Sequence, residues 1–169
     1  MEEKYEKSEQ QLAAERFTRK NHENLSKDFS ENINCRPPND NLLEKAGDLW
    51  IQANDSEKAE QFYERAGRYK YAHAAKMFEK INDSQRAKRF WALAAQNPTG
   101  YGDELDRNSA IYWEAAGEIQ KAISFTQKAI NLFRMQEGGY DLHGDPKNGN
   151  SEARILEREI ERLEKILDE

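Results

Sequence analysis

The hydrophobic and polar positions in the middle of the chain repeat in a way that predicts pairs of helices. In each of three segments, two small residues precede a large aromatic residue, which is followed at fixed spacing by two alanines. Small side chains let two helices approach closely, and the aromatic side chain fills the gap on the next turn. The pattern predicts three antiparallel helix pairs over residues 41–137, with the aromatic positions at Trp50, Phe78 and Trp113 and the first alanines at Ala59, Ala87 and Ala122.

A short polar turn is predicted inside each pair. The turns begin at Asn54, Asn82 and Gly117, and each has Glu or Gln three positions later. This spacing is typical of a capping box at the start of the second helix. Because one helix pair of this size cannot bury its apolar face alone, we expect consecutive pairs to stack on one another.

The N-terminal flank, residues 1–40, is predicted to be a charged helical extension. Leu12 and Phe17, and then Leu25 and Phe29, give two short apolar faces at helical spacing within residues 1–33. The prolines after Arg36 should end any preceding helix, because a residue before proline avoids the helical conformation. We expect this extension to pack only in part.

The C-terminal flank is predicted to be a polar loop, residues 138–150, followed by a helix over residues 151–169 that Ser151 caps. The apolar residues of this helix form one stripe, because they are spaced four, three and four positions apart. We expect the stripe to cover the open end of the repeat array, and a dimer seam is the alternative. The stripe consists of Leu156, Ile160, Leu163 and Leu167.

These spacings resemble those of tetratricopeptide repeats, over roughly residues 40–135. The stretches Glu44–Asp48 and Glu64–Arg68, which both contain Ala-Gly, are similar to the variant found in soluble NSF attachment proteins. Asp106 and Thr126 depart from the pattern, because a large apolar and an aromatic residue are expected there. The resemblance implies an all-α fold, a right-handed α–α superhelix of antiparallel helix pairs with flanking helices at both ends.

Composition and charge narrow the class of protein. The 169 residues carry 26 Lys and Arg against 32 Asp and Glu, a net charge of −6, which disfavours wrapping nucleic acid or lying on anionic lipid. A single cysteine, Cys35, cannot form an intramolecular disulfide. No stretch approaches the ~20 apolar residues of a membrane span, and the acidic start is unlike a signal peptide, so we expect a cytoplasmic protein.

The sequence carries few patterns typical of catalysis or metal binding. Nothing near Cys35 indicates a nucleophile with a paired histidine, and no phosphate-binding glycine motif occurs. The loop that begins at Asp141 and contains His143 partly fits a calcium-loop template, but Pro146 stands where the sharp turn needs glycine. We therefore predict a chain that is not an enzyme and that has no cofactor and no metal.

The tetratricopeptide resemblance implies a concave groove lined by the first helix of each pair. Glu44 and Asp48 would repel the acidic C-terminal peptide that the family's carboxylate clamp grips, so a basic or amphipathic helix is the better partner. The candidate partner-binding residues are Glu44, Asp48, Gln52, Tyr69, His73, Lys76, Lys80, Arg107, Ile111 and Glu114.

The function that follows is a non-enzymatic protein-interaction module, such as an adaptor, scaffold or assembly factor. The alternative is a regulatory subunit of a larger complex that contacts nucleic acid through local basic patches, at Arg65–Lys70 and Arg86–Arg89. Nucleic acid is the less favoured partner, because both patches lie among acidic neighbours. Self-association through the C-terminal helix is a further alternative.

Overall fold

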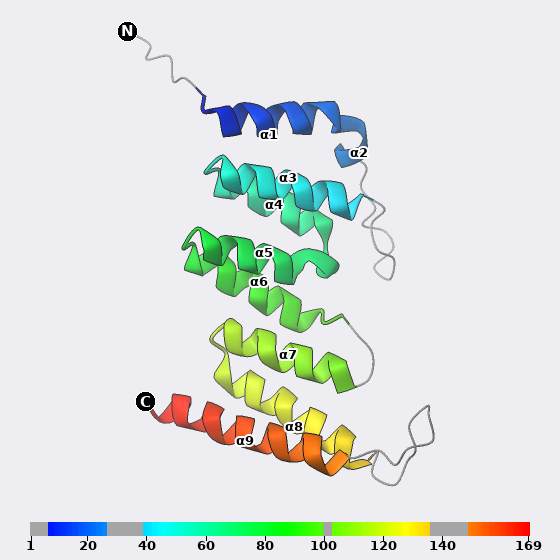
Figure 1. Cartoon of the computed structure of the whole chain (residues 1–169), viewed down its shortest axis with the longest axis vertical. Helices are drawn as coiled ribbons and strands as arrows, with labels where there is room; N and C mark the ends of the chain where they lie inside the picture. Colours follow the sequence, from blue (N-terminus) through cyan, green and yellow to red (C-terminus); the bar gives the residue numbers. More distant parts are fainter. Residues whose placement is uncertain (1–6, 27–38, 100–102, 136–148) are drawn as a thin grey trace. The chain divides into compact units, whose positions relative to one another are not determined.

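The computed structural model describes residues 7–26, 39–99, 103–135 and 149–169 (Figure 1). Its regular elements are all helical, and neighbouring helices form antiparallel pairs, so the all-α prediction is confirmed at this level. The chain divides into two compact units, Met1–Phe90 and Trp91–Glu169. The elements are α1 (Glu9–Lys20), α2 (His22–Ser26), α3 (Asp40–Gln52), α4 (Ser56–Ala66), the 3-10 helix η1 (Arg68–Lys70), α5 (Tyr71–Lys80), α6 (Ser84–Gln96), α7 (Asp103–Ala115), α8 (Ile119–Met135) and α9 (Gly149–Asp168).

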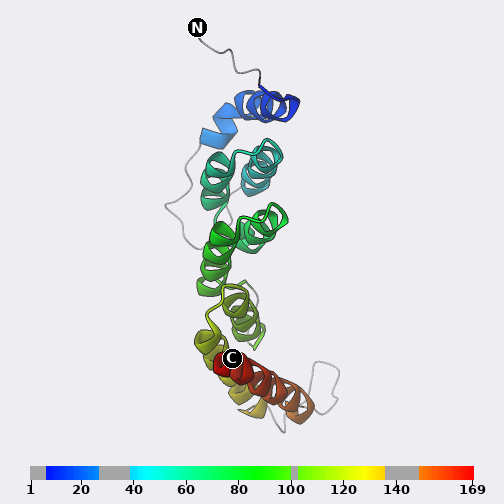
Figure 2. The same ribbon diagram turned by 90° about the vertical axis from the view of Figure 1, so that its left-hand side faces the viewer.

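The first unit is built on the α3–α4 hairpin, against which α5 and α1 pack. Within this unit, Figure 2 shows α3 and α5 on one side and α4 on the other. The N-terminal segment is less continuous than predicted, because the helix breaks at Asn21 between α1 and α2. Phe29, Cys35 and the prolines that follow lie outside the described residues.

The core of the first unit confirms the predicted combination of small and aromatic side chains. Tyr63 is fully buried and meets Phe78 and Phe90 edge-on, at 5.8 and 6.1 Å between ring centroids. Gly47 lies against the same ring, and a Cβ atom on Gly47 would be only 2.6 Å from Cε1 of Tyr63. The small residue at this position is therefore required by the close approach of α3 and α4.

The turns lie where the sequence places them, but the predicted capping residues are wrong. Asn54 and Asn82 have positive φ angles of 58° and 59°, so each ends the helix before it in the left-handed conformation. The next residue caps the following helix: Asp55 accepts from the backbone N–H of Lys58 at 3.0 Å. Asn tolerates the left-handed conformation better than most residues, which explains the division of roles.

In the second unit, α8 packs against both α7 and α9. Its core includes Ala95, Trp113, Ala122 and Leu163. Thr126, which stands where the repeat pattern expects an aromatic residue, is buried, and its hydroxyl donates to the carbonyl oxygen of Ala122 at 2.9 Å. A hollow of about 220 Å³ opens beside Thr126, between α7, α8 and α9.

The C-terminal helix α9 packs against α8 of the same chain, and this contact covers the middle of the predicted stripe. Leu163 is buried, Leu156 and Ile160 are half-buried, and Leu167 is exposed. The helix begins at Gly149, so Ser151 lies inside its first turn and is not the capping residue that we predicted. Within the described part of the chain, no helix is long and apolar enough to cross a bilayer.

Candidate functional site

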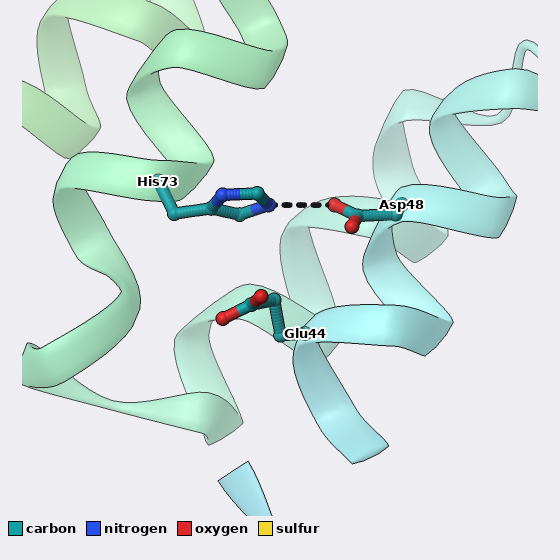
Figure 3. Close-up of side chains that lie close together, drawn as sticks. All are labelled: Glu44, Asp48 and His73. Atoms are coloured by element: carbon teal, nitrogen blue, oxygen red, sulfur yellow. Dashed lines mark hydrogen bonds and ion pairs between the residues drawn. The ribbon is translucent and has the colours of Figure 1, made fainter. Parts of the chain in front are cut away.

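Three of the predicted partner-binding residues come together on the first unit. Glu44 and Asp48 lie one turn apart on α3, and His73 projects toward them from α5 (Figure 3). One oxygen of each carboxylate and one ring nitrogen of His73 all lie within 4.8 Å of one another. Residues four apart share a helix face, and the packing of α5 on α3 brings the imidazole to that face. We call these three residues the acidic–histidine cluster.

On the core side, Asp48 is held in place by Tyr63 of α4. The phenol O–H donates to Oδ1 of Asp48 at 2.6 Å, while the ring belongs to the buried core. Burial raises the pKa of Tyr63 far above its usual value, and the hydrogen bond to Asp48 and the charges of Asp48 and Glu44 raise it further. The phenol therefore stays protonated and donates throughout the physiological pH range.

His73 contacts the same oxygen of Asp48. Its Nε2 lies 2.8 Å from Asp48 Oδ1, and its ring meets the Tyr63 ring edge-on at 6.0 Å. The side chains of His73 and Asp48 are 36% and 29% exposed, so this contact is open to solvent on one side. The imidazole thus links α5 to α3 at the surface, whereas Tyr63 links α4 to α3 from the buried core.

Glu44 has a different partner, Lys70 of η1. The ammonium group of Lys70 forms an ion pair with the Glu44 carboxylate and also donates to Oδ1 of Asn41 at 3.0 Å. Lys70 is more buried than Glu44, with 13% of its side chain exposed against 25%. The two carboxylates of the cluster therefore have separate partners: Glu44 forms an ion pair with Lys70, and Asp48 contacts Tyr63 and His73.

The cluster offers one nitrogen and two carboxylate ligands, a set that suits a divalent transition metal. A cation would have to displace Lys70 from Glu44 and break the contact between His73 and Asp48. As it stands, the arrangement is a network of charges and hydrogen bonds that ties α4, η1 and α5 to α3. Its partly exposed carboxylates are ordered acceptors for a partner's donor groups.

The other predicted partner-binding residues are not in this cluster. Gln52, Tyr69, Lys76 and Lys80 are exposed elsewhere on the first unit. The remaining three, on α7 of the second unit, line the 220 Å³ hollow beside α9, where two of them form ion pairs with α9. They are Arg107, Ile111 and Glu114. A single groove across all three helix pairs stays a prediction.

Two participants, Tyr63 and Lys70, were missed by sequence reasoning. Tyr63 has the spacing of a core residue, and the pattern carries no signal that its hydroxyl reaches a carboxylate. Lys70 lies in η1, a turn of three residues that interrupts the helical pattern between α4 and α5. The calcium-like loop from Asp141 to Asp145 lies outside the described residues.

In the basic patch at Arg86–Arg89, both arginines are paired with carboxylates. Arg86 binds Glu60 at 2.7 Å and Asp83 at 2.8 Å, and Arg89 binds Glu60 and Glu64. Burial alone would raise the pKa of Asp83, but the hydrogen bonds from the side chain and backbone of Arg86 lower it. These contacts support a structural role for the two arginines.

Comparison with protein-family models, curated proteins and solved structures finds no match to this chain. The resemblance to tetratricopeptide repeats thus rests on the residue spacings and helix pairing described above.

Proposed function

We propose that the chain is a non-enzymatic protein-interaction module of tetratricopeptide-like helix pairs, which binds a basic or amphipathic segment of another protein. In this proposal the pairs form a right-handed superhelix, and the first helices of the pairs line its groove. The observation that carries the proposal is the convergence of Glu44, Asp48 and His73 at partly exposed positions on α3 and α5. These are the first helices of consecutive pairs.

The order of the cluster supports binding to a cationic segment. Tyr63 fixes Asp48, and Lys70 fixes Glu44, so little side-chain freedom remains to be lost when a partner binds. An arginine or lysine of the partner can approach these carboxylates from the solvent side while Tyr63 and Lys70 hold them in place. Such charged contacts contribute more to the specificity and the rate of association than to the affinity.

The proposal is tested by affinity capture from the source cells with quantitative mass spectrometry. The variant E44Q/D48N removes both negative charges while keeping the shape of the side chains. The control variant E23Q/E57Q makes the same change in net charge at two exposed positions on α2 and α4. Circular dichroism checks that both variants keep the helical content of the parent protein.

We expect the parent protein and the control to capture the same partner, and E44Q/D48N to lose it. The loss should be mimicked by raising the salt concentration, because exposed charges are screened over about 8–10 Å. Equal capture of the same proteins by all three forms would refute a role for this face of α3 and α5.

A further inference from the structure

A second hollow in the first unit lies between α1 and the α3–α4 hairpin, and it has a volume of about 480 Å³. Leu12, which is 37% exposed, and Trp50, which is only 4% exposed, both line this hollow. The indole N–H of Trp50 donates to Oγ1 of Thr18 at 3.3 Å, and the Thr18 hydroxyl donates to a backbone carbonyl of α1 at 2.8 Å. We call the surface formed by Leu12, Thr18 and Trp50 the floor of the hollow. The Trp50 indole N–H and the Thr18 hydroxyl in this floor both have hydrogen-bond partners, and the open surface of the floor is apolar.

Positive charge surrounds this floor. Arg16, Arg19, Lys58 and His22 line the hollow together with one acid, Glu15. Glu15 is already paired with Lys7 at 2.7 Å. Among the described residues, no carboxylate pairs with Arg16 or Arg19. The hollow is therefore locally cationic in a chain whose net charge is −6.

The spacing of α1 produces this arrangement. Leu12, Arg16 and Arg19 are four and three residues apart, so they share one helix face. Lys58 reaches the same hollow from α4, where its ammonium lies 4.1 Å from the centre of the Trp50 ring and 2.8 Å from Asp55. Two guanidinium groups of α1 and one ammonium group of α4 thus line the same hollow as Leu12 and Trp50.

We propose that this hollow binds an acidic segment of a protein partner, rich in aspartate or glutamate and carrying an aliphatic side chain. The carboxylates of the segment pair with Arg16 and Arg19, and its aliphatic side chain lies against Leu12 and Trp50. Charge complementarity selects this occupant, because Arg16 and Arg19 line the opening with no carboxylate partner among the described residues, whereas Lys58 is paired with Asp55. The site uses none of the residues of the acidic–histidine cluster, so the proposal goes beyond the proposed function and stands without it.

An extended polyanion fits the same cations less well. Nucleic acid carries its charge along its whole length, and the −6 net charge of the chain would repel the part outside the hollow. An apolar floor also offers an aliphatic side chain a contact that a phosphate backbone cannot use. A short acidic polypeptide pairs with the arginines and also contacts the apolar floor.

The experiment uses the full chain labelled with ¹⁵N and a short fluorescein-labelled peptide of aspartate and glutamate with two central leucines. A peptide of lysine and arginine, of equal length and with the same leucines, tests sign selectivity. Fluorescence anisotropy gives the affinity, and the indole N–H signals of the tryptophans report the location. The signal of Trp50 is identified with the variant W50F, and Trp91 and Trp113 serve as internal references in the second unit.

We expect the acidic peptide to bind and to shift the Trp50 indole signal, and the basic peptide to bind at least tenfold more weakly. The variant R16Q/R19Q should weaken acidic-peptide binding about tenfold, because two charge contacts are lost. The matched variant R154Q/R158Q changes two exposed arginines of α9 and the net charge equally, and it should bind like the parent protein. Circular dichroism checks the folding of each variant.

Several outcomes overturn the proposal: no binding of the acidic peptide, equal binding of both peptides, equal affinity of R16Q/R19Q and the parent protein, or signal changes only at Trp91 and Trp113. A single-stranded oligonucleotide of equal charge that binds more tightly than the acidic peptide would also overturn it, in favour of nucleic acid. The acidic–histidine cluster is tested separately by E44Q/D48N. A failure here leaves the proposed function standing, and the converse also holds.

Discussion

Replacing Gly47 by alanine tests the close approach of α3 and α4. In an exposed helix interior this change would stabilise the protein by about 1 kcal/mol, because glycine is a poor helix former. Here the new Cβ atom would meet three atoms of the Tyr63 ring at 2.6 to 2.9 Å. Such distances require the ring or the backbone to move.

The ring has little freedom to move. It is fully buried between Phe78 and Phe90, and its hydroxyl is bound to Asp48. Overpacking a dense core costs about 1 to 3 kcal/mol. After subtracting the gain in helix propensity, we expect Gly47→Ala to lower the free energy of unfolding by about 0 to 2 kcal/mol.

Urea denaturation followed by circular dichroism measures this difference. A double-mutant cycle with Tyr63→Leu isolates the contact, because the penalty of alanine at position 47 should largely disappear when the ring is absent. If Gly47→Ala stabilises the protein, or if its penalty is unchanged in the Tyr63→Leu background, the packing of these two helices is not as described here.

Three further changes test other contacts. Tyr63→Phe removes the hydrogen bond to Asp48 and should cost about 1 to 2 kcal/mol in urea denaturation; an unchanged midpoint would mean that the bond contributes nothing. The hydrogen bonds from Arg86 lower the folded-state pKa of Asp83, so their stabilisation is present above the ordinary aspartate pKa and is lost as the pH falls through the folded value. Melting curves of the parent protein and Asp83→Asn should therefore converge on acidification below about pH 4, and a gap that persists in acid would contradict this. Leu163→Ala should cost about 2 to 4 kcal/mol because the side chain is buried, whereas Leu167→Ala should cost little; equal melting temperatures for the two would show that α9 does not pack on α8 as described.

The helix pairs were predictable because the relevant signal is local. Small and aromatic residues at fixed spacing define one face of a helix, and Ala59, Ala87 and Ala122 are all buried as the pattern requires. The capping residues were not predictable in the same way, since Asn and Asp suit both the end of one helix and the start of the next. Only the backbone shows that Asn54 takes the left-handed conformation and that Asp55 caps.

The candidate site was predictable in part. Glu44 and Asp48 share a face by their spacing alone, but the approach of His73 depends on how α5 packs against α3. Lys70 enters from a three-residue turn that no periodicity marks. Tyr63 has the spacing of a core residue, which describes its ring and not its hydroxyl, because a hydropathy pattern assigns each residue to one environment only.

Tyr63 gives the first unit a constraint on how its surface can evolve. The ring belongs to the core, and the hydroxyl orients a partly exposed carboxylate, so a change at Asp48 leaves a buried phenol without its acceptor. Substitutions at Asp48 therefore alter folding stability together with surface chemistry, whereas Glu44, whose partner is a lysine side chain, can change with a smaller effect on the core. The two carboxylates of the cluster therefore differ in how far a substitution is felt in the core.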